Sequence, residues 1–369
     1  MQGSRNTLQL TSIQIKQFRC FEGTTITFAA PIVLVQGNNG SGKTSLLEAL
    51  HYLCYLRSFR THSPRDLIRS GADGFFIKAL FDQSIEGQSL THEVQVGFSG
   101  KKRLVKMNQQ AVISYKELID HYRIITLTED DLQLINLGPD VRRAFIDQAI
   151  LLHEPDFITT LKAYKNSMEN RNKLLMLGGR DKDSYDVWTQ QMWEKACMIQ
   201  ERRQSLLHKI QQEVNELLAH HFAAEALSIE FGYGAKKMGQ SSFEEFLGEN
   251  ADLYAQEVRF GRSLFGAHLD DFTIKFQNRK SKNFASRGQQ KLIIVLIKIA
   301  QIKQLGALKG PAVFLLDDFM TDFDIPRAQT LMGILNGLES QLIFTSPIAQ
   351  GAFEQSLVEQ GAQRINLTI

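Results

Sequence analysis

The clearest chemistry in this sequence lies in a glycine-rich run that reads Gly37-Asn38-Asn39-Gly40-Ser41-Gly42-Lys43-Thr44-Ser45. Its first eight residues fit the phosphate-loop pattern G-x-x-x-x-G-K-[ST], whose glycines let successive backbone N–H groups converge on one anion. We expect the whole run to bind ATP, with Lys43 reaching the β- and γ-phosphates and the Thr44 hydroxyl ligating Mg²⁺. The alternative is a glycine-rich turn that binds nothing.

A second segment with chemical potential is the apolar stretch at 311–318, which ends in two carboxylates, Asp317 and Asp318. Beside a phosphate loop, we expect Asp317 to hold magnesium through its water shell and Asp318 to orient or deprotonate the attacking water. The predicted catalytic residues are therefore Lys43, Asp317 and Asp318. An acid pair at a strand end could instead cap the next helix.

The third segment reads Ser286-Arg287-Gly288-Gln289-Gln290 and precedes a long apolar stretch. We predict a mostly buried helix that begins at Ser286 or Gly288. A serine hydroxyl and free N–H groups at a helix N-terminus suit a γ-phosphate. A plain serine N-cap is the alternative, so this segment alone does not decide.

The elements that position these segments follow from the hydrophobic pattern. An apolar run at 32–35 precedes the phosphate loop and a helical pattern follows it to about Tyr55, which gives the strand, loop and helix order that the motif requires. Residues 8–35 alternate like strands, and further strand-like runs occur at 75–81, 92–98 and 103–107. We predict an α/β head that contains a mixed sheet with an antiparallel flank.

Between Asp156 and about His221 the apolar period changes to three or four residues, with a polar break at 178–183. This pattern indicates an antiparallel helical pair or a short helical lobe. We place the head (lobe I) at 1–155 and 259–369, and a mainly helical inserted lobe (lobe II) at 156–258.

Composition limits the functions that the chain can have. The 369 residues include 42 basic and 40 acidic ones, for a net charge of +2, so any nucleic-acid contact must be local. Three scattered cysteines fit a reducing cytoplasm. The N-terminus lacks the apolar core of a signal peptide, and Lys298 interrupts the longest apolar run, so we expect no membrane contact.

Two basic clusters are the candidates for DNA contacts. The residues that we select from them are Arg57, Arg60, Arg65, Lys101, Lys102 and Arg103. Each cation that meets a phosphate would add to a salt-dependent affinity that is independent of sequence. A solvated charged face is the alternative for either cluster.

Four runs, at 38–49, 57–60, 138–147 and 284–291, resemble segments of the RecF family of SMC-like DNA-repair ATPases and occur in the same order. The resemblance covers nearly the whole chain and implies an ABC-type P-loop ATPase head. In such heads two subunits enclose two ATP molecules. The signature residues Ser286, Arg287, Gly288 and Gln289 would then contact the ATP of the other subunit, and Asp324 would lie at the seam.

The resemblance also implies a function. It is that of a weak, Mg-dependent ATPase that dimerises on ATP and acts at gapped or single-strand/double-strand junction DNA. The implied partners are RecO, RecR and RecA, the implied processes are recombinational repair, replication-fork maintenance and SOS induction, and the implied location is the bacterial cytoplasm at the nucleoid.

Two segments depart from the family pattern, Thr128-Glu129-Asp130-Asp131-Leu132 and Gly266-Ala267-His268-Leu269, where two prolines and one arginine are missing. These departures put in doubt any DNA or partner contact made by that arginine. Other ABC-type heads, such as a transporter motor or a nuclease-linked ATPase, and an ATP-binding scaffold without turnover remain as alternatives. The transporter histidine is absent from the strand that ends at Thr345-Ser346.

Overall fold

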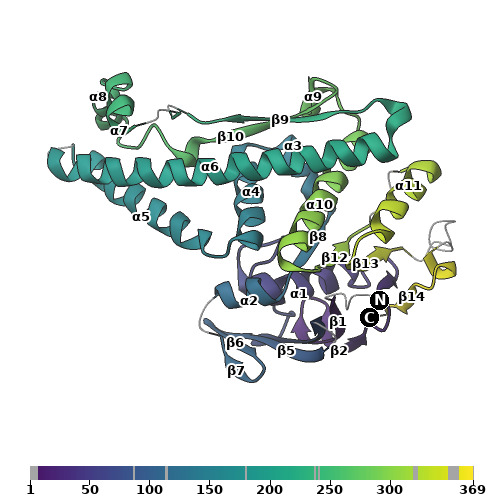
Figure 1. Cartoon of the computed structure of the whole chain (residues 1–369). Coiled ribbons are helices and arrows are strands. Elements are labelled where there is room, and N and C mark those ends of the chain that lie inside the picture. The colour runs from purple at the N-terminus through teal and green to yellow at the C-terminus, as the bar shows by residue number, and fades with distance from the viewer. Residues whose placement is uncertain are drawn as a thin grey trace. The chain divides into compact units, whose positions relative to one another are not determined.

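The computed structural model describes residues 7–85, 88–112, 115–178, 181–236, 238–239, 242–318, 323–347 and 357–368 (Figure 1). It divides into two compact units, which we call the terminal unit (Met1–Asp131 with Lys291–Ile369) and the middle unit (Leu132–Gln290). The division predicted above, with changes at 155/156 and 258/259, differs from these contact-defined units. That domain assignment stays a prediction.

The terminal unit contains an antiparallel sheet with the strand order β2-β1-β4-β5-β6-β7. Its strands are β1 (Thr7–Phe18), β2 (Phe21–Thr27), β4 (Gly74–Ile85), β5 (Gln88–Ser99), β6 (Lys102–Met107) and β7 (Gln110–Ala111). In β1, Leu8 and Leu10 are buried, and so are Ile13 and Ile15. The alternation slips between these pairs because the pairing of β1 with β4 shifts register between Leu10 and Ser12, as a bulge does.

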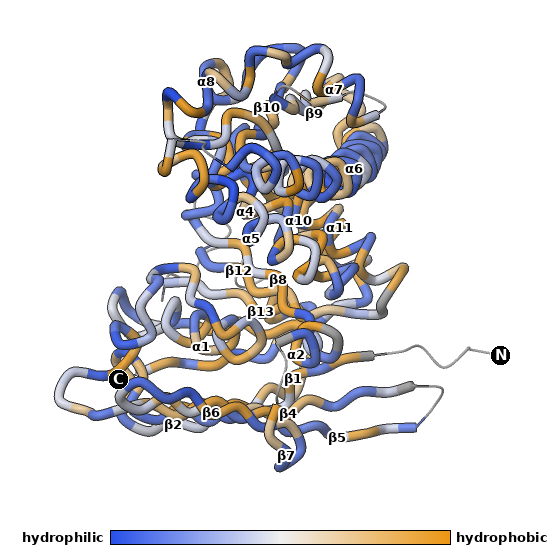
Figure 2. The backbone as a smooth tube through the Cα atoms, turned by 90° about the vertical axis from the view of Figure 1, so that its left-hand side faces the viewer, coloured by the Kyte–Doolittle hydropathy of each residue, from blue (hydrophilic) through white to orange (hydrophobic). Residues whose placement is uncertain are grey.

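A second, parallel sheet in this unit has the order β14-β3-β13-β12-β8. Its strands are β3 (Ile32–Gln36), β8 (Ile124–Leu127), β12 (Val313–Leu316), β13 (Gln341–Ser346) and β14 (Gln363–Asn366). Hydrophobic residues run along β8, β12 and β13 (Figure 2), and every residue of these three strands is buried. Because parallel strands align their carboxyl ends, segments that follow β3, β12 and β13 meet at one edge.

The helices of the terminal unit are α1 (Lys43–Tyr55), α2 (Tyr115–His121), α11 (Ile325–Asn336) and most of α10 (Arg287–Lys309), with short 3₁₀ turns η1 (Pro64–Leu67) and η2 (Glu129–Leu132). The predicted strand, loop and helix order around the phosphate loop is confirmed, because β3 ends at Gln36 and α1 begins at Lys43. The α/β fold class is confirmed as well. Its parallel and antiparallel strands form two separate sheets rather than one.

The middle unit is mainly helical but also contains a small antiparallel sheet of order β11-β10-β9. Its helices are α3 (Gln133–Asn136), α4 (Pro139–His153), α5 (Phe157–Met176), α6 (Lys182–His221), α7 (Phe243–Glu249), α8 (Leu253–Phe260) and α9 (Ser281–Phe284), with η3 (Ala223–Glu225) and η4 (Ala267–Leu269). Its strands are β9 (Ile229–Gly234), β10 (Asp271–Phe276) and β11 (Arg279–Lys280). The predicted helical pair is confirmed as α5 and α6, which pack against each other (Figure 1).

A buried ion pair in the middle unit joins α5 to α8. The Arg171 guanidinium on α5 binds the Glu257 carboxylate, and both side chains are fully buried. Arg171 also donates to the Tyr185 hydroxyl at 2.5 Å and the Ser263 hydroxyl at 2.7 Å. The charges are thus compensated where no water can solvate them.

We expect Arg171→Ala to lower the free energy of unfolding by about 3–5 kcal/mol, because it leaves the Glu257 carboxylate buried without its cation. The shift in the urea unfolding midpoint measures this loss. The double variant Arg171→Met with Glu257→Gln, which buries no charge here, should recover part of it. A single variant as stable as the unchanged chain would contradict a structural role for the pair.

Candidate ATP site at the edge of the parallel sheet

The phosphate loop connects β3 to α1 and is held by its own lysine. The Lys43 ammonium donates to the carbonyl oxygens of Gly37 at 2.8 Å and Asn38 at 3.1 Å, and the residue is 7% exposed. The positive charge of Lys43 therefore lies next to the first residues of the phosphate loop. Gly40 and Gly42 both adopt positive φ, at 85° and 88°, a backbone conformation that favours glycine.

Two further features of this loop fit an anion. A Cβ on Gly37 would meet the Ser41 Oγ at 2.2 Å and the Leu367 carbonyl oxygen at 2.8 Å, so the backbone there is packed too closely for a larger residue. The Ser41 Oγ is buried and, among the described residues, finds no hydrogen-bond partner. A buried hydroxyl without a partner is costly, and a phosphate oxygen would satisfy it.

Asp317 and Asp318 follow β12 directly and face the loop. Asp317 accepts hydrogen bonds from the Thr44 hydroxyl at 2.9 Å and from the Thr345 hydroxyl at 2.7 Å. Thr44 lies on α1 and Thr345 near the end of β13, so three separate elements converge on one carboxylate. The structure thus brings together Thr44 and Asp317, the residues predicted to hold magnesium. The sequence alternative, capping of the next helix, is not the role of Asp317 here.

Asp318 has an unusual backbone conformation, with φ at +44° in a residue other than glycine. Such strain is found at sites where tertiary contacts fix the chain, and here the Asp318 N–H donates to the Thr345 hydroxyl at 3.0 Å. Burial raises the pKa of Asp318, and the neighbouring Asp317 carboxylate raises the pKa further. A raised pKa gives the carboxylate a higher proton affinity, which suits a general base.

Sequence reasoning missed two residues of this site, Thr345 and Lys291. The Thr345 hydroxyl joins Asp317 to the Asp318 backbone, and the Lys291 ammonium on α10 donates to the Asp318 carbonyl oxygen at 3.2 Å. Lys291 is 6% exposed. Two signals were present: a hydroxyl at the end of a buried strand, and a lysine at the start of an apolar helix.

The signature segment lies at the start of α10. The Ser286 Oγ accepts a hydrogen bond from the Gln289 N–H at 3.3 Å, and the Gln289 side chain accepts one from the Ser286 N–H at 2.9 Å. This reciprocal pair is a capping box. Within one chain, Ser286 therefore acts as a helix N-cap, which is the alternative role given above. Ser286 and Arg287 are exposed, and Gly288 and Gln289 are partly exposed. The surface around Ser286 is therefore open to a ligand or partner.

Asp324, the residue predicted at the dimer seam, caps α11. Its carboxylate accepts a hydrogen bond from the Arg327 N–H at 2.9 Å, and the side chain is exposed. Its neighbours Thr321 and Asp322 lie outside the described residues. Capping accounts for Asp324 within one chain, and its place at the seam stays a prediction.

The structure divides the first basic cluster by its charge partners. Arg60 lies 3.4 Å from the fully buried Glu48 carboxylate, which also binds Arg19 at 2.7 Å. Arg57 and Arg65 are exposed. From the second cluster, Lys101, Lys102 and Arg103 are all exposed at the turn between β5 and β6. Arg65, Lys101 and Arg103 line one hollow.

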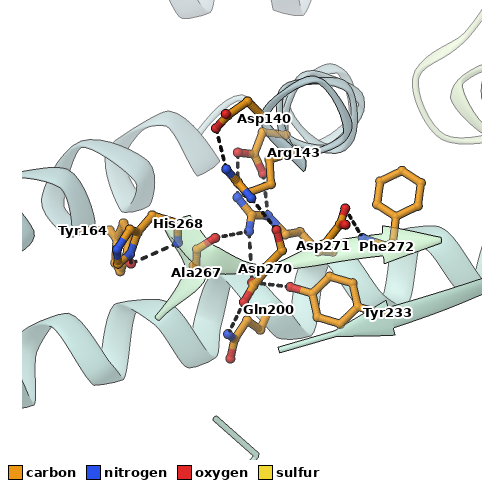
Figure 3. A network of polar contacts seen from close by, with 12 residues as sticks. Asp140, Arg143, Tyr164, Gln200, Tyr233, Ala267, His268, Asp270, Asp271 and Phe272 are labelled. Atoms are coloured by element: carbon orange, nitrogen blue, oxygen red, sulfur yellow. Dashed lines mark hydrogen bonds and ion pairs between the residues drawn. The ribbon is translucent and has the colours of Figure 1, made fainter. Parts of the chain in front are cut away.

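The two segments that depart from the family pattern are both held by hydrogen bonds, and the first also by an ion pair. The Asp131 carboxylate accepts a hydrogen bond from the Thr128 N–H at 2.7 Å and pairs with Lys298 at the same distance. In the middle unit, the Ala267 carbonyl oxygen accepts from Arg203 at 2.7 Å, and His268 bonds the Tyr164 hydroxyl at 2.7 Å (Figure 3).

Around that second segment, Asp270 forms the centre of a polar network, shown in Figure 3. Its carboxylate accepts from Gln200 at 2.8 Å, from Arg203 at 3.0 Å and from the Tyr233 hydroxyl. Burial raises the pKa of Asp270. Contacts of α6, β9 and η4 thus fix the segment with no help from the missing arginine.

A protein-family profile described as an AAA domain matches residues 12–305. The chain belongs to the AAA domain family. It is also 27% identical over 352 residues to the DNA replication and repair protein RecF of Geotalea daltonii, with 93% of this chain and 94% of the relative covered. The resemblance to RecF that the sequence motifs indicated is therefore confirmed.

Solved structures support the fold. A structure of the recombination mediator protein RecF with ATP, from the RecFOR pathway, has a TM-score of 0.83 at 22% identity and covers 95% of this chain and 96% of that one. An Smc head domain of Pyrococcus furiosus has a TM-score of 0.52 at 14% identity, covering 92% and 90%. The fold is that of RecF and SMC-type ATPase heads. In the described part of the chain, no helix has the length and apolar character of a membrane span.

Proposed function

We propose that this chain is a RecF-type DNA replication and repair ATPase. It binds ATP at the phosphate loop, dimerises on ATP, and holds DNA for as long as ATP remains bound. The observation that carries this proposal is the convergence of the phosphate loop, Thr44 and Asp317 at one sheet edge, with the Ser41 hydroxyl buried and lacking a partner in the described structure. An ATP-binding role follows from these groups together with the family.

Magnesium fits the same place. Mg²⁺ prefers oxygen ligands and binds through a small number of protein groups together with substrate phosphates. The Thr44 hydroxyl and the Asp317 carboxylate are 2.9 Å apart beside the phosphate loop, and both offer oxygen. When bound there, the metal would supply positive charge next to the phosphates. Lys43 would bind the β- and γ-phosphates, and Asp318 would orient or deprotonate the attacking water.

ATP-dependent dimerisation is the second part of the proposal. Ser286 is exposed at a helix N-terminus, where a hydroxyl and backbone N–H groups attract an anion. If the γ-phosphate held by one chain binds this segment of a second, ATP becomes part of the interface, and dimer stability is linked to ATP concentration. Hydrolysis then removes the bridging phosphate and releases the dimer.

The biological role is an expectation that the resemblance to RecF implies, namely action at gapped or junction DNA with RecO and RecR as partners and RecA loading as the outcome. A relative named as a DNA replication and repair protein and a RecF structure from the RecFOR pathway support this part of the proposal. Two heads closed on ATP would place two weak DNA sites on one body, and two linked sites bind more tightly than one. DNA residence would then follow the nucleotide state.

Ser286→Arg tests the dimer. We expect it to leave ATP affinity unchanged and to prevent Mg-ATP from shifting the sedimentation coefficient from monomer to dimer, because a long side chain fills the space for the γ-phosphate. The matched control is Ser242→Arg, since the Ser242 Oγ caps α7 by accepting from the Glu245 N–H at 3.1 Å. Both variants lose a serine cap and gain a cation. Normal dimerisation of Ser286→Arg would remove the proposed role of Ser286.

A further inference from the structure

A shallow hollow of about 510 Å³ lies on the terminal unit, where two segments far apart in the sequence meet. Its lining residues are Ser63, Pro64, Arg65, Phe98, Gly100, Lys101 and Arg103. Arg65 comes from η1, whereas Lys101 and Arg103 come from the turn between β5 and β6 and the strand after it. The fold thus joins one member of the first basic cluster to two of the second.

The arrangement of these cations is held by ordered structure. Gly100 adopts φ of +61°, which lets the chain reverse between β5 and β6, and Ser99 pairs with Lys102 across the turn. The Arg103 guanidinium lies 5.5 Å from the centroid of the buried Tyr52 ring, a contact that orients its charge without neutralising it. Phe98 supplies an apolar part of the lining.

Ion pairing distinguishes the cations of this hollow from two neighbouring arginines. Arg60 pairs with Glu48 at 3.4 Å, and Arg69 pairs with Glu22 at 2.8 Å. Within the described ranges, no carboxylate lies at ion-pair distance from Arg65, Lys101 or Arg103. The three cations around this hollow therefore repel each other, and a bound anion would reduce this repulsion.

We propose that this hollow binds the phosphodiester backbone of duplex DNA, with Arg65, Lys101 and Arg103 contacting phosphates. This inference rests on the proposed function, and it assigns the DNA contact to three named residues. An open hollow lined by uncompensated cations suits a long, charged rod, because each phosphate contact releases condensed counterions. It reads no base edge, so binding is independent of sequence.

An anionic bilayer also attracts cations, but it is flat and matches a concave surface poorly. A free phosphate ion would call for an enclosed site with buried donors, and this hollow is open. The geometry therefore favours a nucleic-acid backbone over both, and the test below includes each as an outcome that overturns the assignment.

The test compares two triple variants. The first is Arg65→Gln, Lys101→Gln, Arg103→Gln. The control is Lys165→Gln, Arg202→Gln, Lys275→Gln, whose cations already pair with Glu169, Glu154 and Glu230. Both remove three positive charges, so a difference between them reports on position and not on net charge.

DNA affinity is measured by fluorescence anisotropy of a duplex in the presence of Mg-ATP, over a range of salt concentrations. We expect the first variant to lose about 2.7 from the slope of log affinity against log salt, or about 0.9 per phosphate contact, and to bind roughly 100-fold more weakly at about 0.1 M salt. The control should keep both the slope and the affinity. Equal slopes for the two variants would overturn the proposal.

Two further measurements make the result specific. Two other ligands are tested with the same variants, phosphatidylserine vesicles and inorganic phosphate. The assignment to DNA would be overturned if the first variant lost binding to either of these ligands but kept its affinity for duplex DNA. Sedimentation with Mg-ATP should show the first variant dimerising like the unchanged chain. If the unchanged chain did not dimerise, the proposed function would fail. The salt dependence of DNA affinity in the two triple variants would still test whether the hollow binds DNA.

Discussion

Asp318→Asn is expected to slow ATP hydrolysis by about 100-fold or more while leaving ATP binding intact, because an amide cannot accept the proton of the attacking water. The substitution keeps the size of the side chain, and the Asp318 N–H still donates to the Thr345 hydroxyl. With ATP retained, the γ-phosphate stays available to a second chain. The variant should therefore accumulate as a long-lived dimer.

Release of phosphate under single-turnover conditions measures the chemical step, and sedimentation after dilution from ATP measures the lifetime of the dimer. The control is Asp181→Asn, at an exposed aspartate that accepts from the Ser184 N–H at the start of α6. Undiminished hydrolysis by Asp318→Asn would show that another group activates the water. An unchanged chain with no hydrolysis at all would favour the scaffold alternative.

Lys43→Ala should weaken ATP binding by roughly 100-fold and so abolish ATP-induced association. Hydrogen bonds to a charged group contribute about 1.5–3 kcal/mol each, and the ammonium that we place on the β- and γ-phosphates has no replacement in the variant. The variant also loses the bonds from Lys43 to the carbonyl oxygens of Gly37 and Asn38, which span the loop.

Calorimetric titration with ATP in the presence of magnesium gives the affinity, and the thermal unfolding midpoint shows whether the variant remains folded. Lys275→Ala is a suitable control, since Lys275 pairs with Glu230 on the small sheet of the middle unit. If Lys43→Ala bound ATP as tightly as the unchanged chain, the phosphate loop would not be the nucleotide site.

Together the two variants separate the two halves of the ATP cycle. One should prevent the dimer from forming, and the other should prevent it from opening. If DNA residence depends on the dimer, Lys43→Ala should shorten it and Asp318→Asn should lengthen it. Residence times that respond to neither variant would disconnect DNA binding from the nucleotide.

Several features of this protein are local and could be read from the sequence. The phosphate loop is continuous in the chain, and its glycine positions are required by backbone geometry, with Gly40 and Gly42 at positive φ as the motif demands. The strand before it follows from a continuous apolar run, and the helix after it and the pair α5 and α6 follow from helical hydrophobic patterns. The resemblance to RecF could also be recognised from the sequence, because the motifs that carry it are short continuous runs of residues.

The pairing of the strands could not be predicted from the sequence. Alternating apolar residues indicate strands but not their partners, and only the structure shows that the parallel and antiparallel strands of the predicted α/β head belong to two sheets. Similarly, β9 and β10 pair across a gap of thirty-six residues, which no local pattern reveals.

Only the tertiary structure decided how charges and hydroxyls are distributed. Arg60 and Arg65 belong to one cluster in the sequence, yet Arg60 pairs with Glu48 and Arg65 meets Lys101 and Arg103 at a hollow. Thr345 reaches Asp317 because β13 and β12 are parallel neighbours. The sequence determined which chemical groups the chain carries and the local backbone around ATP, since both depend on near neighbours. Contacts between distant segments, which depend on how the strands pair and pack, decided which of those groups act together.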